Sequence, residues 1–420
     1  MEVYWIFALL TFLGLLMYFT QVFSIRQYLK SKPQEITDYP MPPVSILKPL
    51  KGVEDNLFDN LVSFCKLDYP TYEIIFCLQD QNDPAYKIAM MVKQRHPDKD
   101  ITIIVEPCSI ALNPKINNLI PAYNASKYEY VLISDSNVMV GADYIKSIVS
   151  RMSDSSVGLV TNLIRGIGGR SFGAIFENLH LNAFIIGSVC FLDKYLHIPC
   201  VIGKSMLMKK IDFNAIGGFS QFKDVLAEDF IIGREMKKFG KKVVVSEYMI
   251  QNINEYWSLG RFLNRHTRWG KLRWKIGGYQ YISELLCNPI FMSFLVVLSA
   301  SGQRLSALIF ALFISLLKII GDYYINNLTS NHYSQQKYPL SVCYNNKANI
   351  KQHLFVPAKD ILIGLIWFIP LISSTVDWRG NKYIIGKDSR LYEYNSNLSV
   401  FKKTAQKLRL SVSRVLTSIF

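Results

Sequence analysis

Acidic residues stand at the ends of short apolar runs in the first part of the chain. Asp80 and Asp83 follow the run "YEIIFCL", and Asp135 follows "YVLIS". The pair Glu228–Asp229 opens the helix-like stretch "EDFIIG". Carboxylates can bind a hard cation such as Mg²⁺ or Mn²⁺, which takes oxygen ligands. A carboxylate can also act as a general base that removes the proton of a hydroxyl group.

A cationic and aromatic stretch supplies the opposite charge. It begins with "RHTRW" (Arg265–Trp269), and further basic residues follow. A nucleotide diphosphate is both anionic and metal-chelating, so it accounts for the acids and the arginines together. We therefore predict that Asp135 binds Mg²⁺ or Mn²⁺ and that Asp229 is the general base on an acceptor hydroxyl. Arg265 and Arg268 would hold the diphosphate, because a guanidinium group makes bidentate contacts with phosphate.

Each of these features also has a simpler structural interpretation. Asp83 precedes Pro84 and suits a helix N-cap, and Asp135 suits an Asx turn at the end of a strand. The pair Glu228–Asp229 suits the first turn of a helix. The arginines and tryptophan of "RHTRW" suit a membrane interface. The occurrence of all four at the ends of strands of one predicted sheet favours a functional site.

The elements that would position these residues alternate along the chain. Between Val44 and about Val245, six apolar runs are separated by longer amphipathic segments. The runs are "VSILKPL", "YEIIFCL", "ITIIVE", "YVLISD", "VGLVT" and "KVVVSE". This alternation predicts an α/β domain over residues 44–275, with a mostly parallel, Rossmann-like sheet covered by helices. Ligands of such sheets bind beyond the carboxyl ends of the strands, where the acids lie.

An uncharged segment precedes this domain. Val3–Phe23 has no charged residue and is long enough to cross a bilayer. A signal peptide is the alternative, but Glu2 stands where a basic start is usual and no small-residue cleavage site follows. We predict a membrane helix over residues 1–25 and a linker over 26–43. Basic residues after the helix place the following domain in the cytosol.

Apolar segments return after the predicted domain. Residues 284–325 predict a hairpin of two membrane helices that meet at Gly302–Arg304. Residues 354–376 predict a third apolar segment, either a span or a re-entrant helix. Residues 377–420 form a basic tail whose last part, "FKKTAQKLRLSVSRVLTSIF", predicts an interfacial helix or a solvated surface helix.

The composition restricts the function classes. The 420 residues include 47 Lys and Arg against 32 Asp and Glu, a net charge of +15, which suits nucleic acid, an anionic membrane or a phosphorylated ligand. The basic cluster is local and has no aromatic stacking platform, so nucleic-acid binding is not expected. The seven cysteines and six histidines lack metal-site spacing, and the odd number of cysteines predicts free thiols.

An ordered set of motifs resembles a known family. "SILKPLKG", "CLQDQNDPA", "NPKINNL", "ISDSN", "IGKSMLMKK", "GGF", "LAEDF" and "RHTRW" occur in this order, and "DWRGNKY" follows later. The set is similar to that of the ceramide glucosyltransferase family, the family-21 relatives of family-2 glycosyltransferases with a GT-A fold. Bacterial transferases that glycosylate hopanoids share much of it. Two departures are Ile185 and Ile186 in place of the animal His-Pro element, and Asp-Ser-Asn in place of Asp-x-Asp.

The resemblance implies roles for individual residues. Asp83 and Asp135 would serve the sugar nucleotide and its metal, Asp229 would be the base, and "RHTRW", with Trp269, would grip diphosphate and sugar. We include Asp80, next to Asp83 in the same motif, among the residues expected to bind the UDP-sugar. Lys115 and Lys48 are further expected contacts to nucleotide or phosphate, with a solvated surface role as the alternative.

The predicted activity is inverting transfer of a sugar, glucose first, from UDP-glucose to ceramide at a membrane. UDP-N-acetylglucosamine as donor and a hopanoid or diacylglycerol as acceptor form the alternative within this class. A non-catalytic membrane scaffold with a degenerate nucleotide pocket is the alternative outside it, and a processive polysaccharide synthase would need more spanning helices. The expected location is a bacterial inner membrane, or the Golgi or endoplasmic reticulum of a eukaryote, with the catalytic domain on the cytosolic face.

Overall fold

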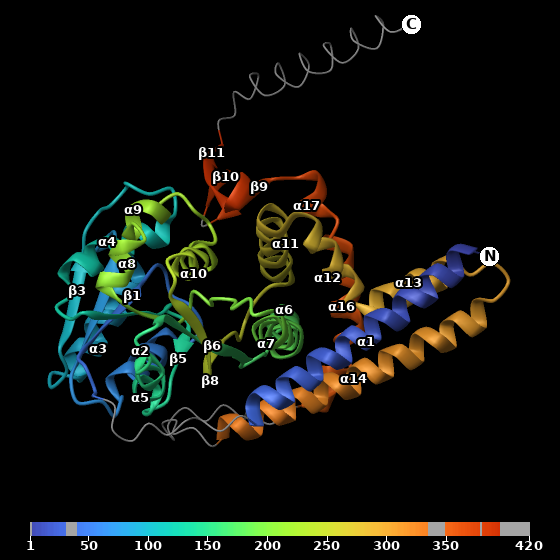
Figure 1. Ribbon diagram of the computed structural model, residues 1–420, viewed down its shortest axis with the longest axis horizontal. Helices are drawn as coiled ribbons and strands as arrows, with labels where there is room; N and C mark the ends of the chain where they lie inside the picture. Colours follow the sequence, from blue (N-terminus) through green and yellow to red (C-terminus); the bar gives the residue numbers. More distant parts are fainter. Residues whose placement is uncertain (1, 31–39, 335–348, 379, 395–420) are drawn as a thin grey trace, which may run out of the picture.

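The computed structural model describes residues 2–30, 40–334, 349–378 and 380–394, and it joins an α/β layer to a bundle of apolar helices (Figure 1). The interfacial helix expected near the C-terminus lies outside these ranges. The cysteines within them are all free thiols, as predicted.

The α/β layer is built on an eight-stranded sheet with the order β3-β2-β1-β4-β7-β6-β8-β5. Its strands are β1 (Val44–Pro49), β2 (Tyr72–Leu78), β3 (Ile101–Val105), β4 (Tyr130–Ile133), β5 (Val138–Met139), β6 (Val157–Ile167), β7 (Met206–Lys209) and β8 (Lys242–Ile253). The first four strands are parallel, as are β6 and β8, whereas β7 runs antiparallel between β4 and β6. The predicted mostly parallel α/β sheet is confirmed.

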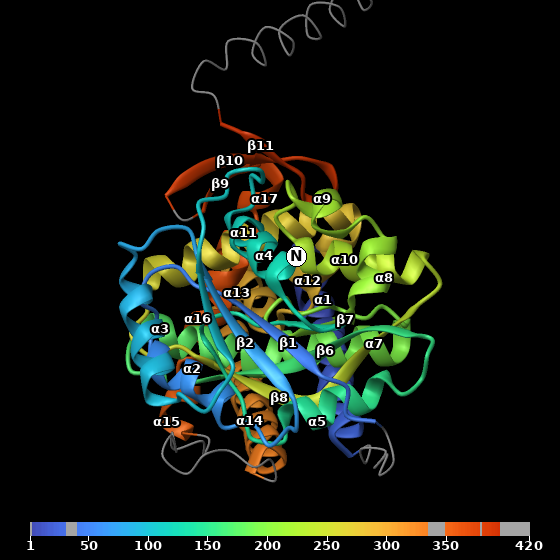
Figure 2. The ribbon, with the colours of Figure 1, turned by 90° about the vertical axis from the view of Figure 1, so that its left-hand side faces the viewer.

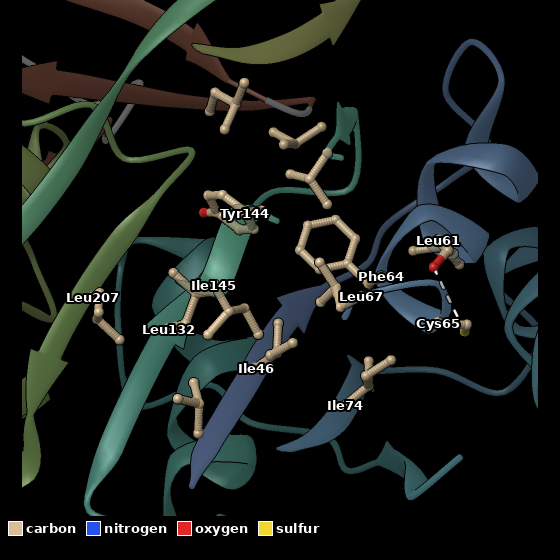
Figure 3. Close-up of a cluster of buried hydrophobic side chains, with 14 of the residues drawn as sticks. Ile46, Leu61, Phe64, Cys65, Leu67, Ile74, Leu132, Tyr144, Ile145 and Leu207 are labelled. Carbon is tan, nitrogen blue, oxygen red and sulfur yellow. Dashed lines mark hydrogen bonds between the residues drawn. The ribbon is translucent and has the colours of Figure 1, made fainter. Parts of the chain in front are cut away.

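Helices cover both faces of this sheet, because neighbouring residues of a strand point to opposite faces. Ile46 of β1 packs into one core with Phe64 and Tyr144, and Figure 3 shows these side chains. Leu47, the next residue, packs into a second core with Ile116. Figure 2 shows the two helical layers above and below the sheet. The first core takes α2 (Leu57–Cys65), α3 (Pro84–Arg95) and α5 (Tyr144–Val149); the second takes α4 (Pro114–Ala125), α8 (Lys210–Ala215), α9 (Gly218–Phe222) and α10 (Glu228–Lys238).

A continuous helical segment inside the predicted domain is more apolar than the sequence analysis recognised. It comprises α6 (Phe172–His180), a π-helical turn (Leu181–Ile185) and α7 (Ile186–Leu196). The segment is long and apolar enough to cross a membrane, but much of it is buried within the protein. It packs against α1 (Glu2–Lys30). Gly187 allows this approach, because a Cβ atom there would lie 3.1 Å from the Gln21 side chain.

The remaining helices form the apolar bundle and its junction with the sheet (Figure 1). They are α11 (Leu259–Gly277), α12 (Ile282–Leu286), α13 (Pro289–Ser299), α14 (Arg304–Ser334), α15 (Ile350–His353), α16 (Val356–Ile366) and α17 (Ile369–Ile372). The predicted hairpin corresponds to α13 and α14, with Gly302 in the left-handed conformation (φ 83°) between them. Within the described ranges, four helical segments are long and apolar enough to span a membrane, or five if the bent pair formed by α11–α12 and α13 is counted.

The outer faces of the bundle are apolar. On α1, Trp5, Leu9 and Phe12 are exposed, and on α14, Leu312 and Leu316 are exposed. A soluble protein seldom leaves apolar surfaces this extensive in water, so these faces indicate a lipid environment.

A buried network of charges connects the helices of the bundle. Lys318 and Asp322 of α14 form an ion pair of 2.7 Å, and Lys318 also lies 3.7 Å from Asp360 of α16. Asp360 in turn pairs with Lys359, and Tyr18 of α1 donates a hydrogen bond to Asp322. The network therefore ties three helices together through two balanced pairs of opposite charge.

Residues 377–394 differ from the basic tail that the sequence analysis expected. They complete a small antiparallel sheet of β9 (Thr375–Trp378), β10 (Asn381–Ile385) and β11 (Leu391–Glu393). Val376 and Ile385 pack with Leu226 and Leu272, so this sheet covers the end of the α/β layer next to α10 and α11. Its alternation of apolar and polar residues, with Gly380 at the turn, favours a hairpin over a helix.

Candidate active site

A cavity of about 1140 Å³ opens where the sheet, α7, α10 and α11 meet α1. Of the nine residues predicted to contact substrate or metal, six line it, namely Lys115, Asp135, Asp229, Arg265, Arg268 and Trp269, whereas Lys48 does not. They come from distant parts of the sequence, and the fold brings them to one space. Asp80 and Asp83 do not form part of its wall.

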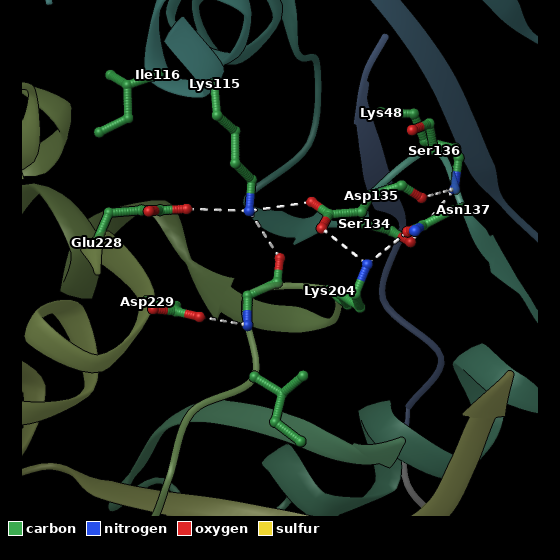
Figure 4. A network of polar contacts seen from close by, with 12 residues as sticks. Lys48, Lys115, Ile116, Ser134, Asp135, Ser136, Asn137, Lys204, Glu228 and Asp229 are labelled. Atoms are coloured by element: carbon green, nitrogen blue, oxygen red, sulfur yellow. Dashed lines mark hydrogen bonds and ion pairs between the residues drawn. The ribbon is translucent and has the colours of Figure 1, made fainter. Parts of the chain in front are cut away.

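Asp135 lies just beyond β4, and lysines surround it (Figure 4). Its Oδ1 is 3.0 Å from Lys115 Nζ and its Oδ2 is 3.4 Å from Lys204 Nζ. Lys48, which is fully buried beneath it, donates to its backbone carbonyl at 2.9 Å. Burial lowers the pKa of Lys204, although Asp135 opposes that effect. The acid at the end of this strand is therefore balanced by side chains that themselves can bind an anion.

Lys115 connects Asp135 to α10. Its Nζ lies 3.0 Å from Glu228 Oε1 and donates to the Gly203 carbonyl at 2.8 Å. Burial alone would lower the pKa of Lys115, but Asp135 and Glu228 together raise it above its ordinary value. Lys115 is therefore a permanently charged group between two carboxylates, held by the first turn of α4.

Asp229 occupies the first turn of α10. It accepts hydrogen bonds from Gly203 N and Phe230 N, each at 2.8 Å. A Cβ atom on Gly203 would lie 2.7 Å from Asp229 Oδ2, so glycine is needed for this contact. Burial, with a further contribution from Glu228, raises the pKa of Asp229 to about 6. A carboxylate with that pKa is ionised at neutral pH yet is a stronger base than an ordinary aspartate.

The arginines lie on α11 among aromatic rings. Arg265 forms an ion pair of 3.2 Å with Glu177, which is completely buried, and its guanidinium lies 4.3 Å from the Trp269 ring centre. His266 bonds the other oxygen of Glu177 at 2.8 Å. The guanidinium of Arg268 lies 5.9 Å from the Trp378 ring centre, which places the "DWRGNKY" motif beside the site. Glu177 therefore fixes the position of Arg265 on the cavity wall.

Asp80 and Asp83 have local structural roles. Asp80 is exposed and accepts from Asn82 N. Asp83 is the N-cap of α3, accepting from Ala85 N at 2.9 Å and from Gly52 N at 2.8 Å. The structural interpretation of Asp83 as a helix cap is thus correct, and a contact of either acid with the nucleotide stays a prediction.

Two substitutions of Asp83 separate the two roles. Asp83→Ala removes the cap and should lower the free energy of unfolding by about 1 to 2 kcal/mol, whereas Asp83→Asn keeps a capping side chain and should cost little. If Asp83 also binds the nucleotide, Asp83→Asn should weaken UDP binding without loss of stability. Calorimetric UDP titration together with thermal unfolding in detergent measures both effects. Unchanged UDP affinity in both variants would exclude Asp83 from the donor site.

The sequence analysis did not assign three charged residues that the structure places here. Lys204 and Glu228 lie on the cavity wall, and Glu177 lies behind Arg265. Lys204 and Glu228 occur within the motifs "IGKSMLMKK" and "LAEDF". The sequence therefore shows the two motifs, but it does not show that Lys204 contacts Asp135 or that Glu228 contacts Lys115. For Glu177 no chemical signal was available, because its importance arises from contacts across the fold.

The residues around Asp135 show whether the predicted metal ion has suitable ligands there. Asp135 offers one carboxylate, and no cluster of three or more His, Cys, Asp or Glu side chains in the described ranges is arranged to hold a metal. Mg²⁺ commonly binds one or two protein carboxylates and takes its other ligands from water and substrate phosphates. Asp135 supplies the carboxylate for this mode of binding, but Lys115 and Lys204 lie next to its two oxygens, so a cation would have to replace at least one of these ion pairs.

Comparison with known proteins adds a family match. The model of "Glycosyl transferase family 21" matches residues 5–391. "Ceramide glucosyltransferase 3" of Caenorhabditis elegans is 32% identical over 237 residues, which cover 56% of this chain and 51% of that protein. "Ceramide glucosyltransferase 1" of the same organism is 27% identical over 364 residues, or 84% of this chain and 74% of that protein. The match to the first relative thus spans about half of that relative's length.

Among solved structures, the chain is similar to the "Mannosyltransferase PcManGT from Pyrobaculum calidifontis in complex with GDP-Man and Mn2+". The TM-score is 0.48 at 13% identity, covering 86% of this chain and 98% of that one. "S. aureus TarS 1-349 in complex with UDP-GlcNAc" gives a TM-score of 0.37 at 14% identity, covering 84% and 99% of the two chains.

Proposed function

The chain belongs to glycosyl transferase family 21, and from this membership we propose that it transfers glucose from UDP-glucose to the hydroxyl group of ceramide, with inversion to β-glucosylceramide. One observation carries the proposal. A single cavity contains a basic carboxylate, Asp229, a set of lysines and arginines, and apolar walls that lead toward helices long enough to cross a membrane. The relatives whose names specify ceramide support the choice of acceptor.

The donor is held by the cationic part of the cavity. Lys115, Lys204, Arg265 and Arg268 all line it and can surround a diphosphate. As the glycosidic bond to UDP breaks, negative charge grows on the leaving oxygen. Fixed cations lower the energy of that state because they need no reorganisation during the reaction.

Asp229 acts as the base in the proposed reaction. The lipid hydroxyl attacks the anomeric carbon from the face opposite UDP and loses its proton to a carboxylate oxygen of Asp229. Gly203 N and Phe230 N orient this carboxylate through their hydrogen bonds. One proton moves to the enzyme, one C–O bond forms, and one C–O bond breaks as UDP leaves.

We also propose that Asp135 holds Mg²⁺ or Mn²⁺ when the nucleotide is bound. Such an ion would neutralise charge on the diphosphate oxygens. Removing divalent ions with EDTA is expected to lower the rate of glycolipid formation more than about tenfold, and either metal should restore it. In Asp135→Asn the residual rate should respond little to either treatment. A wild-type enzyme that keeps its full rate after chelation would contradict the metal role of Asp135.

The side of the membrane on which the catalytic domain lies is inferred from the basic residues near the C-terminal end of α1. Arg26 and Lys30 lie at the end of this helix that leads into the α/β layer. Basic residues concentrate on the cytosolic side of membrane helices. We therefore propose that the protein is anchored in a membrane with its catalytic domain in the cytosol.

The test of the proposed function is direct identification of the product. Membranes from a host that lacks glucosylceramide and expresses this chain are incubated with UDP-glucose or UDP-N-acetylglucosamine, and the lipids are analysed by mass spectrometry. Glucosylceramide supports the proposal. An N-acetylglucosaminyl lipid would show that the donor is UDP-N-acetylglucosamine. A glycosylated hopanoid or diacylglycerol would show that the acceptor is not ceramide. The absence of UDP release with every lipid would favour a non-catalytic scaffold.

A further inference from the structure

One face of α11 changes from cationic to apolar along its length. In the second half, Arg273 still lines the cavity, but its charge is paired with Glu284 at 2.7 Å. Further lining residues are Arg261, Arg265 and Arg268 in the first half of the helix, and Leu272 and Ile276 in the second. These residues recur every three or four positions, so they share one side of the helix. The cavity therefore continues from the diphosphate region into a part with mainly apolar walls, which also contains the Arg273–Glu284 ion pair.

The helical segment 181–196 forms a second apolar wall of the same cavity. Leu181, Ile185, Ser188, Leu192 and Leu196 line it, again at intervals of three or four residues. We call the part of the cavity between this stripe and the second half of α11 the apolar arm. The whole cavity, about 1140 Å³, exceeds the roughly 300–1,000 Å³ of pockets that hold a single small molecule. It therefore has room for a second ligand beside a nucleotide sugar.

Gln21 of α1 contributes a polar group to the wall of the cavity. Its residue surface is only 7% exposed. The carboxamide lines the cavity, yet it makes no hydrogen bond with any residue in the described ranges. Because the carboxamide faces the cavity, it can donate hydrogen bonds to a ligand there and accept hydrogen bonds from it. A ligand that combines hydrocarbon with a polar linkage therefore suits both the apolar wall and Gln21.

We propose that the apolar arm binds the hydrocarbon chains of the acceptor lipid and that Gln21 hydrogen-bonds to the amide or ester linkage between those chains and the reacting headgroup. The inference rests on the proposed function, since the lipid is the acceptor whose hydroxyl reaches Asp229. The position of the arm supports it, because Gln21 belongs to a helix whose outer face carries exposed apolar residues. A lipid can enter from the bilayer without exposing its chains to water.

The first experiment fills part of the apolar arm with a larger side chain, which reduces the space for hydrocarbon chains. Ser188→Trp places a large ring on its wall, and Lys194→Trp, on the same helix but outside the wall, is the matched control. With purified full-length protein in vesicles, Ser188→Trp should lower kcat/KM for an acceptor with long chains about 100-fold. It should affect an acceptor with chains of roughly six carbons much less, and UDP affinity should not change. Equal loss for both chain lengths, or equal loss in the control, would overturn the proposal.

The second experiment removes the polar contact. Gln21→Leu should lower kcat/KM for ceramide about tenfold, because the lipid amide loses its partner. An ester offers only acceptors to a carboxamide, so the loss with diacylglycerol should be smaller. Gln27→Leu makes the same change on α1 outside the cavity, where Gln27 accepts an exposed hydrogen bond from Tyr195 at 3.3 Å, and should change kcat/KM for ceramide less than about twofold. If Gln21→Leu matches the wild type with ceramide, Gln21 does not bind the lipid.

Different experimental results would contradict the proposed activity and the proposed lipid site. If the wild-type protein makes no glycolipid from any sugar donor and lipid, the activity itself is wrong. If the wild-type protein makes glycolipid and both cavity variants match their controls, only the apolar arm as the lipid site is wrong.

Discussion

Replacing Asp229 with Asn is expected to reduce glycolipid formation at least about 1000-fold while leaving UDP affinity nearly unchanged, because general base catalysis contributes roughly two to four powers of ten. The Asn side chain can accept only one of the two hydrogen bonds, because Gly203 N donates to Oδ2 of Asp229 and Phe230 N donates to Oδ1, so thermal unfolding of the variant checks that this turn persists. Rapid measurement of labelled glycolipid and calorimetric UDP binding test the two halves of the expectation.

The matched control changes another buried acid. Asp212 forms an ion pair of 3.1 Å with Lys241 and does not line the cavity. Asp212→Asn should therefore leave the rate of transfer unchanged at a temperature where it remains folded. Normal turnover by Asp229→Asn would remove Asp229 from the role of base.

The pH dependence of the wild-type enzyme provides a second measurement of the same role. Because the pKa of Asp229 is raised to about 6, the base is ionised above that pH and becomes protonated below it. The value of kcat/KM should therefore fall as the pH drops, about tenfold per unit below the pKa. An unchanged rate between pH 7 and pH 5 would contradict a base with this pKa.

Replacing Arg268 with Ala is expected to raise the KM for the UDP-sugar about 100-fold, since losing a charged contact to a buried anion costs about 2–5 kcal/mol. Arg268→Lys should recover part of the loss, because a lysine provides charge without the planar fork of a guanidinium. Initial rates over a range of donor concentrations separate KM from kcat.

The control for this prediction is Arg95→Ala, which removes an exposed arginine of α3 far from the cavity wall. Arg265→Ala is a less clean test, because it leaves the carboxylate of Glu177 buried without its guanidinium partner. That variant should lose stability as well as donor affinity. An unchanged donor KM in Arg268→Ala would exclude the phosphate role.

Much of the sheet could be predicted because its strands are strongly apolar. Each of the six predicted runs contains a strand. The strands β5 and β7 were not predicted, since β5 has two residues and β7 reads "MLMK", too short for an alternating pattern. The apolar character of the segment 172–196 was also missed, because it lies between strands and its polar residues interrupt the run.

Site residues could be predicted only where a charged residue lies next to an apolar run in the sequence. Asp135 and Asp229 end or begin apolar stretches, and the structure places both on one cavity. Asp83 has the same appearance in the sequence but serves as a helix cap. Lys204 and Glu177 act through partners far away in the chain, and no spacing in a single sequence encodes such contacts.

The ion pairs of the helical bundle bear on how the protein reaches its membrane. Lys318 has its counter-ion one turn away in Asp322 on the same helix, and Lys359 has its own in the adjacent Asp360. If α14 and α16 enter the bilayer during synthesis, each already carries a neutralised pair. Neither helix then depends on the other to be accepted by the insertion machinery, so the bundle can be integrated one segment at a time as the ribosome releases it.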